Sequence, residues 1–186
     1  MAAPILPLHT DRLLLRPFVD GDLEAFYDIY RRGEVARHMP WEPRTREMAV
    51  EMLERVKTLT SFDADPHVIR LAAVLPESGA LIGDVGLTQT SAEHRQGEIG
   101  FIIHPEHQRR GYATEACTAI LRLGFGELGL HRIIARADAR NDGSVGVMER
   151  LGMRREALFH HNELIRGGWS DQVLYAILED EWRARG

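Results

Sequence analysis

Short apolar stretches of strand length alternate with amphipathic helical patterns along the chain, and this alternation limits the possible folds more than any other feature. Leu23, Phe26, Tyr27 and Tyr30, for example, recur at helical spacing. Because helices interrupt the strands, we expect an α/β (α+β) fold, a mixed sheet with helices on its faces. Strands are predicted at 12–18, 67–75, 81–88, 96–104, 131–137, 153–159 and 169–177, and helices after 20–22, after Thr45, and over 111–128 and 142–151.

Length and composition indicate one domain. The 186 residues are 44% hydrophobic and 27% charged, as in ordinary globular proteins. Cys117 is the only cysteine, which excludes an intramolecular disulfide. No apolar run approaches the ~20 residues that span a bilayer, and the first residues lack the basic and apolar parts of a signal peptide. We therefore expect a single domain over 1–186, a cytoplasmic location and no membrane partner.

Charge and histidine spacing argue against two further classes of function. The chain has 23 Lys and Arg against 28 Asp and Glu, a net charge of −5, whereas nucleic-acid-binding proteins usually carry a basic excess. His104 and His107 enclose a proline and a glutamate, but their spacing is not that of two zinc ligands one helical turn apart. We expect neither nucleic-acid binding nor a metal site.

The stretch 98–116 places a strand, a polar loop and a helix in direct succession. Pro105 ends the strand pattern, and the helix begins near Gly111. The first turn of a helix has unpaired backbone N–H groups and partial positive charge, so it can bind a phosphate or diphosphate. Gly111 allows close approach because it has no Cβ, and Arg109 and Arg110 add charged donors. The pattern is typical of an anion site, and also of a basic surface turn.

Four segments carry motifs that occur together in one family. Residues 108–113 read Q-R-R-G-Y-A and match the signature Q/R-x-x-G-x-G/A. Residues 141–144 followed by 149–153 match N-x-x-S…LGF, while 123–132 and 171–182 carry further similarity. In this order the segments resemble the GNAT (GCN5-related) N-acetyltransferases, in particular the ribosomal-protein (RimJ/RimL-type) branch. The resemblance implies one GNAT-like domain with a mostly antiparallel sheet of about seven strands, splayed at a cofactor cleft and flanked by helices on both faces.

The resemblance also implies acetyl-CoA as co-substrate, with no metal. Backbone amides of the loop would hold the diphosphate, and the pantetheine arm would pair with the free edge of the strand ending at 101–103. Asn141 would lie beside the coenzyme, although N-D-G-S at 141–144 also forms a turn and helix cap unaided. The implied coenzyme residues are Phe101, Ile102, Ile103, Gln108, Arg109, Arg110, Gly111, Tyr112, Ala113, Thr114, Asn141 and Ser144.

The catalytic residues of many family members do not transfer to this chain. Those enzymes use a strand glutamate as base and a helix tyrosine as acid, but Arg136 and Met148 stand at these positions. The RimL-type branch instead uses a serine and a carboxylate, which match Ser144 and Glu163. Ser144 would protonate the leaving thiolate or donate a hydrogen bond to it. Glu163 would take the proton of the acceptor ammonium, directly or through water.

Other residues compete for proton transfer and for the acceptor pocket. Glu98 lies at the start of the coenzyme strand, and His161 in a histidine pair just before Glu163 is a further proton acceptor. Both residues are also typical of ordinary solvent-exposed surface groups without a catalytic role. Trp41 lies between prolines and either lines the acceptor pocket or plugs the helix pair.

Two classes of function follow from this sequence. The first is an acetyl-CoA-dependent N-acetyltransferase acting on a primary amine, either a protein N-terminus or a small molecule, as a monomer or homodimer. The second is a catalytically silent acyl-CoA-binding or interaction domain of the same fold.

Overall fold

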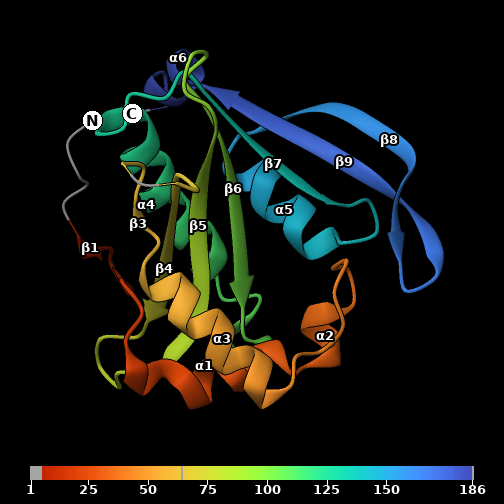
Figure 1. Ribbon diagram of the computed structural model, residues 1–186. Coiled ribbons are helices and arrows are strands. Elements are labelled where there is room, and N and C mark those ends of the chain that lie inside the picture. Colours follow the sequence, from red (N-terminus) through yellow and green to blue (C-terminus); the bar gives the residue numbers. More distant parts are fainter. Residues whose placement is uncertain (1–5, 64, 186) are drawn as a thin grey trace.

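A nine-stranded sheet forms the centre of the computed structural model, which describes residues 6–63 and 65–185 (Figure 1). The strand order is β1-β2-β4-β5-β6-β7-β9-β8, and β3 pairs with β4. The pairing is antiparallel except between β6 and β7. The strands are β1 (Leu8–His9), β2 (Leu14–Arg16), β3 (Thr60–Ser61), β4 (Val68–Val74), β5 (Leu81–Ser91), β6 (Gln96–Ile103), β7 (Arg132–Asp138), β8 (Arg154–Ile165) and β9 (Gly168–Leu178).

The predicted α/β class and mostly antiparallel sheet are confirmed. Seven strands lie at the predicted places, and the sequence pattern misses only β1 and β3. Each of these has two residues, too few to show alternation. Of the domain predicted over 1–186, residues 1–5, 64 and 186 lie outside the described part of the chain.

Helices cover both faces of the sheet. Phe26 of α1 and Leu53 of α3 pack with Ala72 and Val74 on one face. On the other face α4 and α5 pack against the side chains that alternate with these, such as Leu71. The helices are α1 (Leu23–Tyr30), α2 (Gly33–Ala36), α3 (Arg46–Lys57), α4 (Tyr112–Gly126), α5 (Asp142–Arg150) and α6 (Glu179–Arg183).

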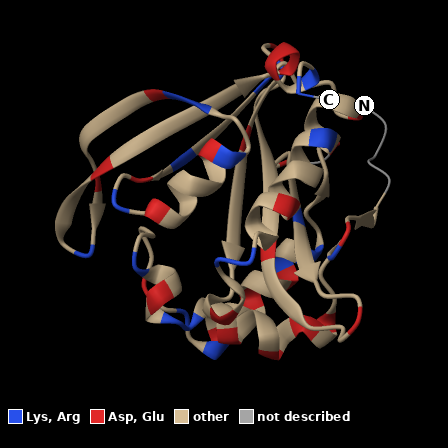
Figure 2. Ribbon diagram, turned by 180° about the vertical axis from the view of Figure 1, so that it is seen from behind, with Lys and Arg blue, Asp and Glu red and all other residues tan. Residues whose placement is uncertain are grey.

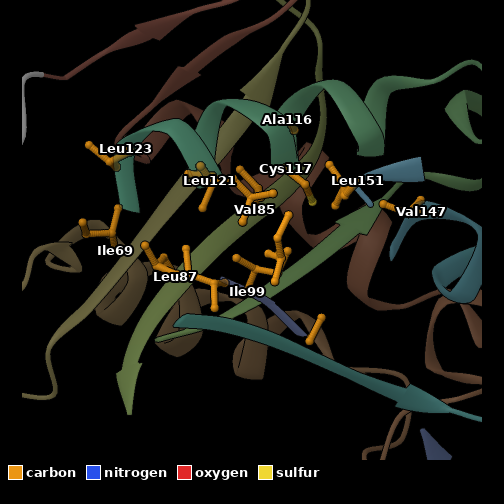
Figure 3. Close-up of a cluster of buried hydrophobic side chains, with 14 of the residues drawn as sticks. Ile69, Val85, Leu87, Ile99, Ala116, Cys117, Leu121, Leu123, Val147 and Leu151 are labelled. Carbon is orange, nitrogen blue, oxygen red and sulfur yellow. The ribbon is translucent and has the colours of Figure 1, made fainter. Parts of the chain in front are cut away.

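The larger core lies between α4 and the central strands. Figure 3 shows Cys117 and Leu121 of α4 above Val85 and Leu87 of β5, with Leu151 beside them. All these side chains are buried. A helix held by such packing keeps its first turn in a fixed position relative to the sheet.

The sheet splays between its two parallel strands. β6 and β7 pair only from Gln96↔Arg132 to Glu98↔Ile134. Beyond this point β6 continues to Ile103 paired with β5 alone, while β7 continues paired with β9. The second half of β6 therefore has a free edge toward β7, and α4 begins just beyond the end of that edge.

Candidate active site

A cleft of about 900 Å³ opens at the splay. Its wall comes from the end of β6, the following loop, the first turn of α4, the first residues of α5 and the segment around α2. Every residue that the sequence predicts for the coenzyme lines this cleft except Arg110. The fold thus brings the 101–114 stretch and the 141–144 motif to one cavity.

Gly111 is the point at which the loop turns into α4. Its φ of +85° is left-handed, a conformation that glycine adopts without the strain a Cβ would bring. Arg109, two residues earlier, also has a positive φ, of +60°. The turn leads directly into the first residues of α4, Tyr112, Ala113 and Thr114, which line the cleft.

The first turn of α4 has backbone donors without partners. No side chain caps the helix at Gly111, and among the described residues no hydrogen bond satisfies the N–H groups of 112–114. The preceding loop is basic, and acidic and basic residues mix over the rest of the molecule (Figure 2). Unpaired donors with partial positive charge fit an anionic group such as a diphosphate.

We call the loop and first helical turn at 108–114 the mouth of the cleft. Residues outside the coenzyme motif hold this mouth in place. Arg12 pairs with Glu115 at 2.6 Å, and its guanidinium lies 4.6 Å from the centre of the Tyr112 ring. Arg12 also donates a hydrogen bond to the carbonyl of Arg110, and the Gln108 amide donates to the carbonyl of Ile103. The side chains therefore position the loop, while its backbone amides remain available.

Asn141 and Ser144 form the second motif at the start of α5. The Asn141 side chain caps the helix by accepting from the Ser144 backbone N–H at 3.1 Å. Both residues line the cleft, and no hydrogen bond of the Ser144 hydroxyl occurs among the described residues. Met148, at the position where many family members carry a tyrosine, is buried in the core.

The predicted carboxylates Glu98 and Glu163 lie outside the cleft lining, and Glu98 is on the face of β6 opposite α4 because its neighbour Ile99 packs in the core with α4. Glu98 lies 3.6 Å from Arg136, and its pKa is raised because burial, together with the negative charge of Glu163, outweighs the attraction of Arg136. Glu163 accepts a hydrogen bond from Gln172 at 2.6 Å. We call Glu98, Arg136, Glu163 and Gln172 the acceptor-side cluster, after the role that the sequence resemblance predicts for its two carboxylates.

Trp41 packs in the α1 and α3 cluster rather than in the cleft. Its ring lies 5.5 Å from that of Tyr30, and the Arg44 guanidinium lies over it at 5.0 Å. The next residue, Glu42, pairs with Arg166 in the β8–β9 turn at 3.7 Å. The Trp41 loop therefore contacts the hairpin that carries Glu163.

Three polar residues of the site region carry no recognisable motif. His38 and Arg140 line the cleft, and Asp138 lies buried at the end of β7. They come from segments about 100 residues apart, so no local pattern could have joined them.

Two classes of feature are absent from residues 6–63 and 65–185. No group of three or more His, Cys, Asp or Glu side chains is arranged to hold a metal ion. No helix in this part of the chain is long and apolar enough to cross a bilayer.

The geometry agrees with a match to a known family. Residues 12–154 match the Acetyltransferase (GNAT) domain, so the chain belongs to the GNAT acetyltransferases, a family that uses acetyl-CoA. It is an acyltransferase enzyme of the N-acetyltransferase kind.

Among its relatives is YnaD of Bacillus subtilis, an uncharacterized N-acetyltransferase that is 36% identical over 94% of this chain and 98% of YnaD. The [ribosomal protein uS5]-alanine N-acetyltransferase of Escherichia coli is 28% identical over 96% of this chain and 94% of its own length.

Solved structures show the same fold. A GNAT acetyltransferase from Bacillus anthracis superimposes with a TM-score of 0.84 at 32% identity, covering 95% of this chain and all of the other. Spermidine N-acetyltransferase from Vibrio cholerae, solved with CoA and spermine, has a TM-score of 0.79 at 24% identity over 94% of this chain and 99% of its own.

Proposed function

We propose that this chain transfers an acetyl group from acetyl-CoA to a primary amine by direct attack in a ternary complex, as a single domain over 1–186. The observation that carries the proposal is the first turn of α4, whose unpaired amides open into the same cleft as the free edge of β6. Unpaired amides at a helix start bind a diphosphate, and a free strand edge pairs with an extended arm that contains amide groups.

The loop at 108–114 would hold the diphosphate of the coenzyme. Gly111, Tyr112, Ala113 and Thr114 line the cleft, so their backbone amides would face the diphosphate, and Arg109 adds positive charge there. The amide groups of the pantetheine arm would pair with the edge of β6 at 101–103, where β7 has separated. This arrangement brings the thioester, which supplies an activated acetyl group, to the start of α5.

Ser144 is the proposed acid. Ser144 lines the cleft, and its backbone N–H is engaged in the cap of α5, so its hydroxyl would be the group available to the coenzyme. A hydroxyl at this place can donate to the leaving thiolate sulfur. Asn141 would support this role by fixing the first turn of α5.

Glu163, with Glu98, would receive the acceptor. Two carboxylates attract a cationic amine, and Glu163 would take the ammonium proton, directly or through water, as the acceptor enters. His161 has left-handed φ and is exposed, and we rank it behind Glu163 for this role. Relatives are named for ribosomal-protein alanine and for spermidine, so protein N-termini and polyamines are the first acceptors to test. Trp41 would form part of the acceptor wall.

A catalytically silent acyl-CoA-binding domain is the second candidate. The observation that favours it is the replacement of the family's glutamate and tyrosine by Arg136 and the buried Met148. Such a domain would bind the coenzyme without turning it over.

One experiment separates the two candidates. Acetyl-CoA binding is measured by calorimetry, and thiol release is followed with spermidine, spermine and a peptide that begins with alanine. We expect acceptor-dependent thiol release and a matching mass gain of one acetyl group on the acceptor. Tight coenzyme binding with no release across the panel would establish the silent domain instead.

A further inference from the structure

His38 and Asp138 approach each other at the wall of the coenzyme cleft. His38 follows α2, whereas Asp138 ends β7, and Figure 1 shows α2 below the connection from β7 to α5. The His38 Nδ1 atom lies 3.6 Å from the Asp138 Oδ2 atom. The pair joins two segments that the splay of the sheet leaves on either side of the cleft.

The imidazole of His38 is oriented with one nitrogen inward. Nδ1 is buried and has no hydrogen-bond partner among the described residues, while 23% of the side chain remains exposed. The exposed part of the side chain belongs to atoms other than Nδ1, and Nε2 is the ring nitrogen among them, so Nε2 is the nitrogen that can face the cleft. A small closure of the 3.6 Å gap would let Nδ1–H donate to Asp138, which leaves Nε2 as a proton acceptor.

Asp138 is suited to hold this tautomer because it is buried and ionised. Its side chain is 0% exposed, and it accepts from the Arg140 guanidinium at 2.7 Å and from the Arg140 backbone N–H at 2.8 Å. Burial alone would raise the pKa of Asp138, but these hydrogen bonds outweigh it and hold the pKa below its usual range. The other charged groups that line the cleft with His38 are Glu34, Arg37, Arg109, Arg140, Asp142 and Arg150.

We infer that His38 is a catalytic residue of this site, positioned by Asp138, and that it accepts the proton which the attacking nitrogen loses as the amide forms. The inference rests on the proposed function. Glu163 takes the first proton, which converts the ammonium to an amine. As the C–N bond forms and the C–S bond breaks, His38 Nε2 takes the second proton from nitrogen. Ser144 gives its proton to sulfur. Glu163 and His38 then release their two protons to the solvent and Ser144 takes one back from it, so each turnover releases one proton.

The first test compares His38→Gln with wild type, using acetyl-CoA and either spermidine or an alanyl peptide. Glutamine keeps a polar side chain but cannot accept the proton, so we expect kcat to fall about 100-fold. The dissociation constant of acetyl-CoA should change by less than about threefold. His94→Gln is the matched control, because His94 lies exposed in the turn between β5 and β6.

A second test separates the two proton acceptors. At about pH 9 the α-amine of the alanyl peptide is mostly neutral, so the first proton no longer has to be removed. We expect Glu163→Gln to recover at this pH, whereas His38→Gln stays impaired. Imidazole should restore part of the activity of His38→Ala, after subtraction of an acceptor-free control.

The role of Asp138 is tested by a double-mutant cycle. Asp138→Asn should lower kcat in the wild-type background and have little further effect in His38→Gln, because it acts through that ring. A purely structural role would give additive losses.

Three outcomes would overturn the inference. One is an active wild type with His38→Gln within about threefold of it in kcat. Another is a loss in kcat that is matched by lost coenzyme binding and not restored by imidazole. A wild type inactive with every acceptor would overturn the proposed function as well, so the two failures are distinguishable.

Discussion

The coenzyme mouth and the acceptor-side cluster are built in different ways. The mouth at 108–114 is one continuous stretch of chain that lines the cleft except at Arg110, and among the described residues no hydrogen bond satisfies its N–H groups at 112–114. The acceptor-side cluster consists of side chains from four strands, β6, β7, β8 and β9. A site made of backbone tolerates many side chains, whereas a site made of side chains changes its preference with each substitution.

Under the proposed function, this contrast would allow one fold to keep its coenzyme and change acceptors. Substitutions in the mouth matter where they alter backbone shape, as at Gly111. Substitutions in the cluster matter through charge, as at Glu98 and Arg136. The predictions below test whether the two regions separate in this way.

Gly111→Val should have the largest effect. The left-handed φ of +85° strains a β-branched residue, and a Cβ at this position would lie 3.2 Å from the guanidinium of Arg12, which holds the loop in place. We expect acetyl-CoA affinity to fall about 100-fold or more, measured by calorimetry. Gly126→Val is the control, because Gly126 lies at the other end of the same helix with open space around it. Near-normal affinity in Gly111→Val would contradict a backbone-built mouth.

Ser144→Ala should come next and should affect turnover alone. Alanine keeps the backbone N–H that donates to Asn141, so the cap of α5 survives. We expect kcat to fall about 10- to 100-fold in a thiol-release assay, with coenzyme affinity unchanged. Ser78→Ala, in the turn between β4 and β5, removes a hydroxyl far from the cleft and should be neutral. A full rate in Ser144→Ala would remove the proposed acid.

Charge changes in the acceptor-side cluster should alter acceptor binding by a smaller factor. We expect Glu163→Gln and Glu98→Gln to raise KM for spermidine about tenfold at low salt, and less for an acceptor with a single positive charge. Arg136→Gln should lower KM for spermidine, because it removes a positive charge beside Glu98. Coenzyme affinity should stay constant throughout, with Glu77→Gln in an exposed turn as control. An equal loss of coenzyme affinity would mean that the two regions are not separate.

The smallest predicted effect is on the free energy of unfolding, whose pH dependence has opposite signs at Glu115 next to the mouth and at Glu98 in the acceptor-side cluster. Burial alone would raise the pKa of Glu115 at the mouth, but hydrogen bonds from Thr10 and Arg12 outweigh burial and lower it. Glu115 therefore stabilises the fold above the unfolded-state pKa of about 4.3, and this contribution is lost as the pH falls. The pKa of Glu98 is raised in the folded protein, so its pH dependence is the opposite. Its contribution to stability is present at low pH and is lost as the pH rises through the folded-state pKa.

Urea unfolding between about pH 2 and pH 7 measures this difference, because the contribution of Glu115 is lost only below its unfolded-state pKa. Relative to wild type, Glu115→Gln should be less stable at neutral pH and equal at acidic pH. Glu98→Gln should gain stability relative to wild type as the pH rises. Parallel pH dependences in the two variants would show that the two carboxylates do not differ in this way.

Much of the fold and of the mouth could be predicted because the signals are local. Strand and helix periodicity, Gly111 before a helix and the N-x-x-S motif each lie within a short window of sequence. The start of the splay at Glu98 and Ile134 could not be read from the residues, since it depends on pairing between distant strands. For the same reason no pattern joined His38 to Asp138, or Arg12 to Glu115.

The most direct test of the central claim is a crystal structure of the protein with coenzyme A. The account predicts phosphate oxygens about 2.7–3.2 Å from the backbone nitrogens of 111–114, with the pantetheine arm along β6 at 101–103. Phosphates bound elsewhere on the molecule, with the first turn of α4 facing solvent, would contradict it.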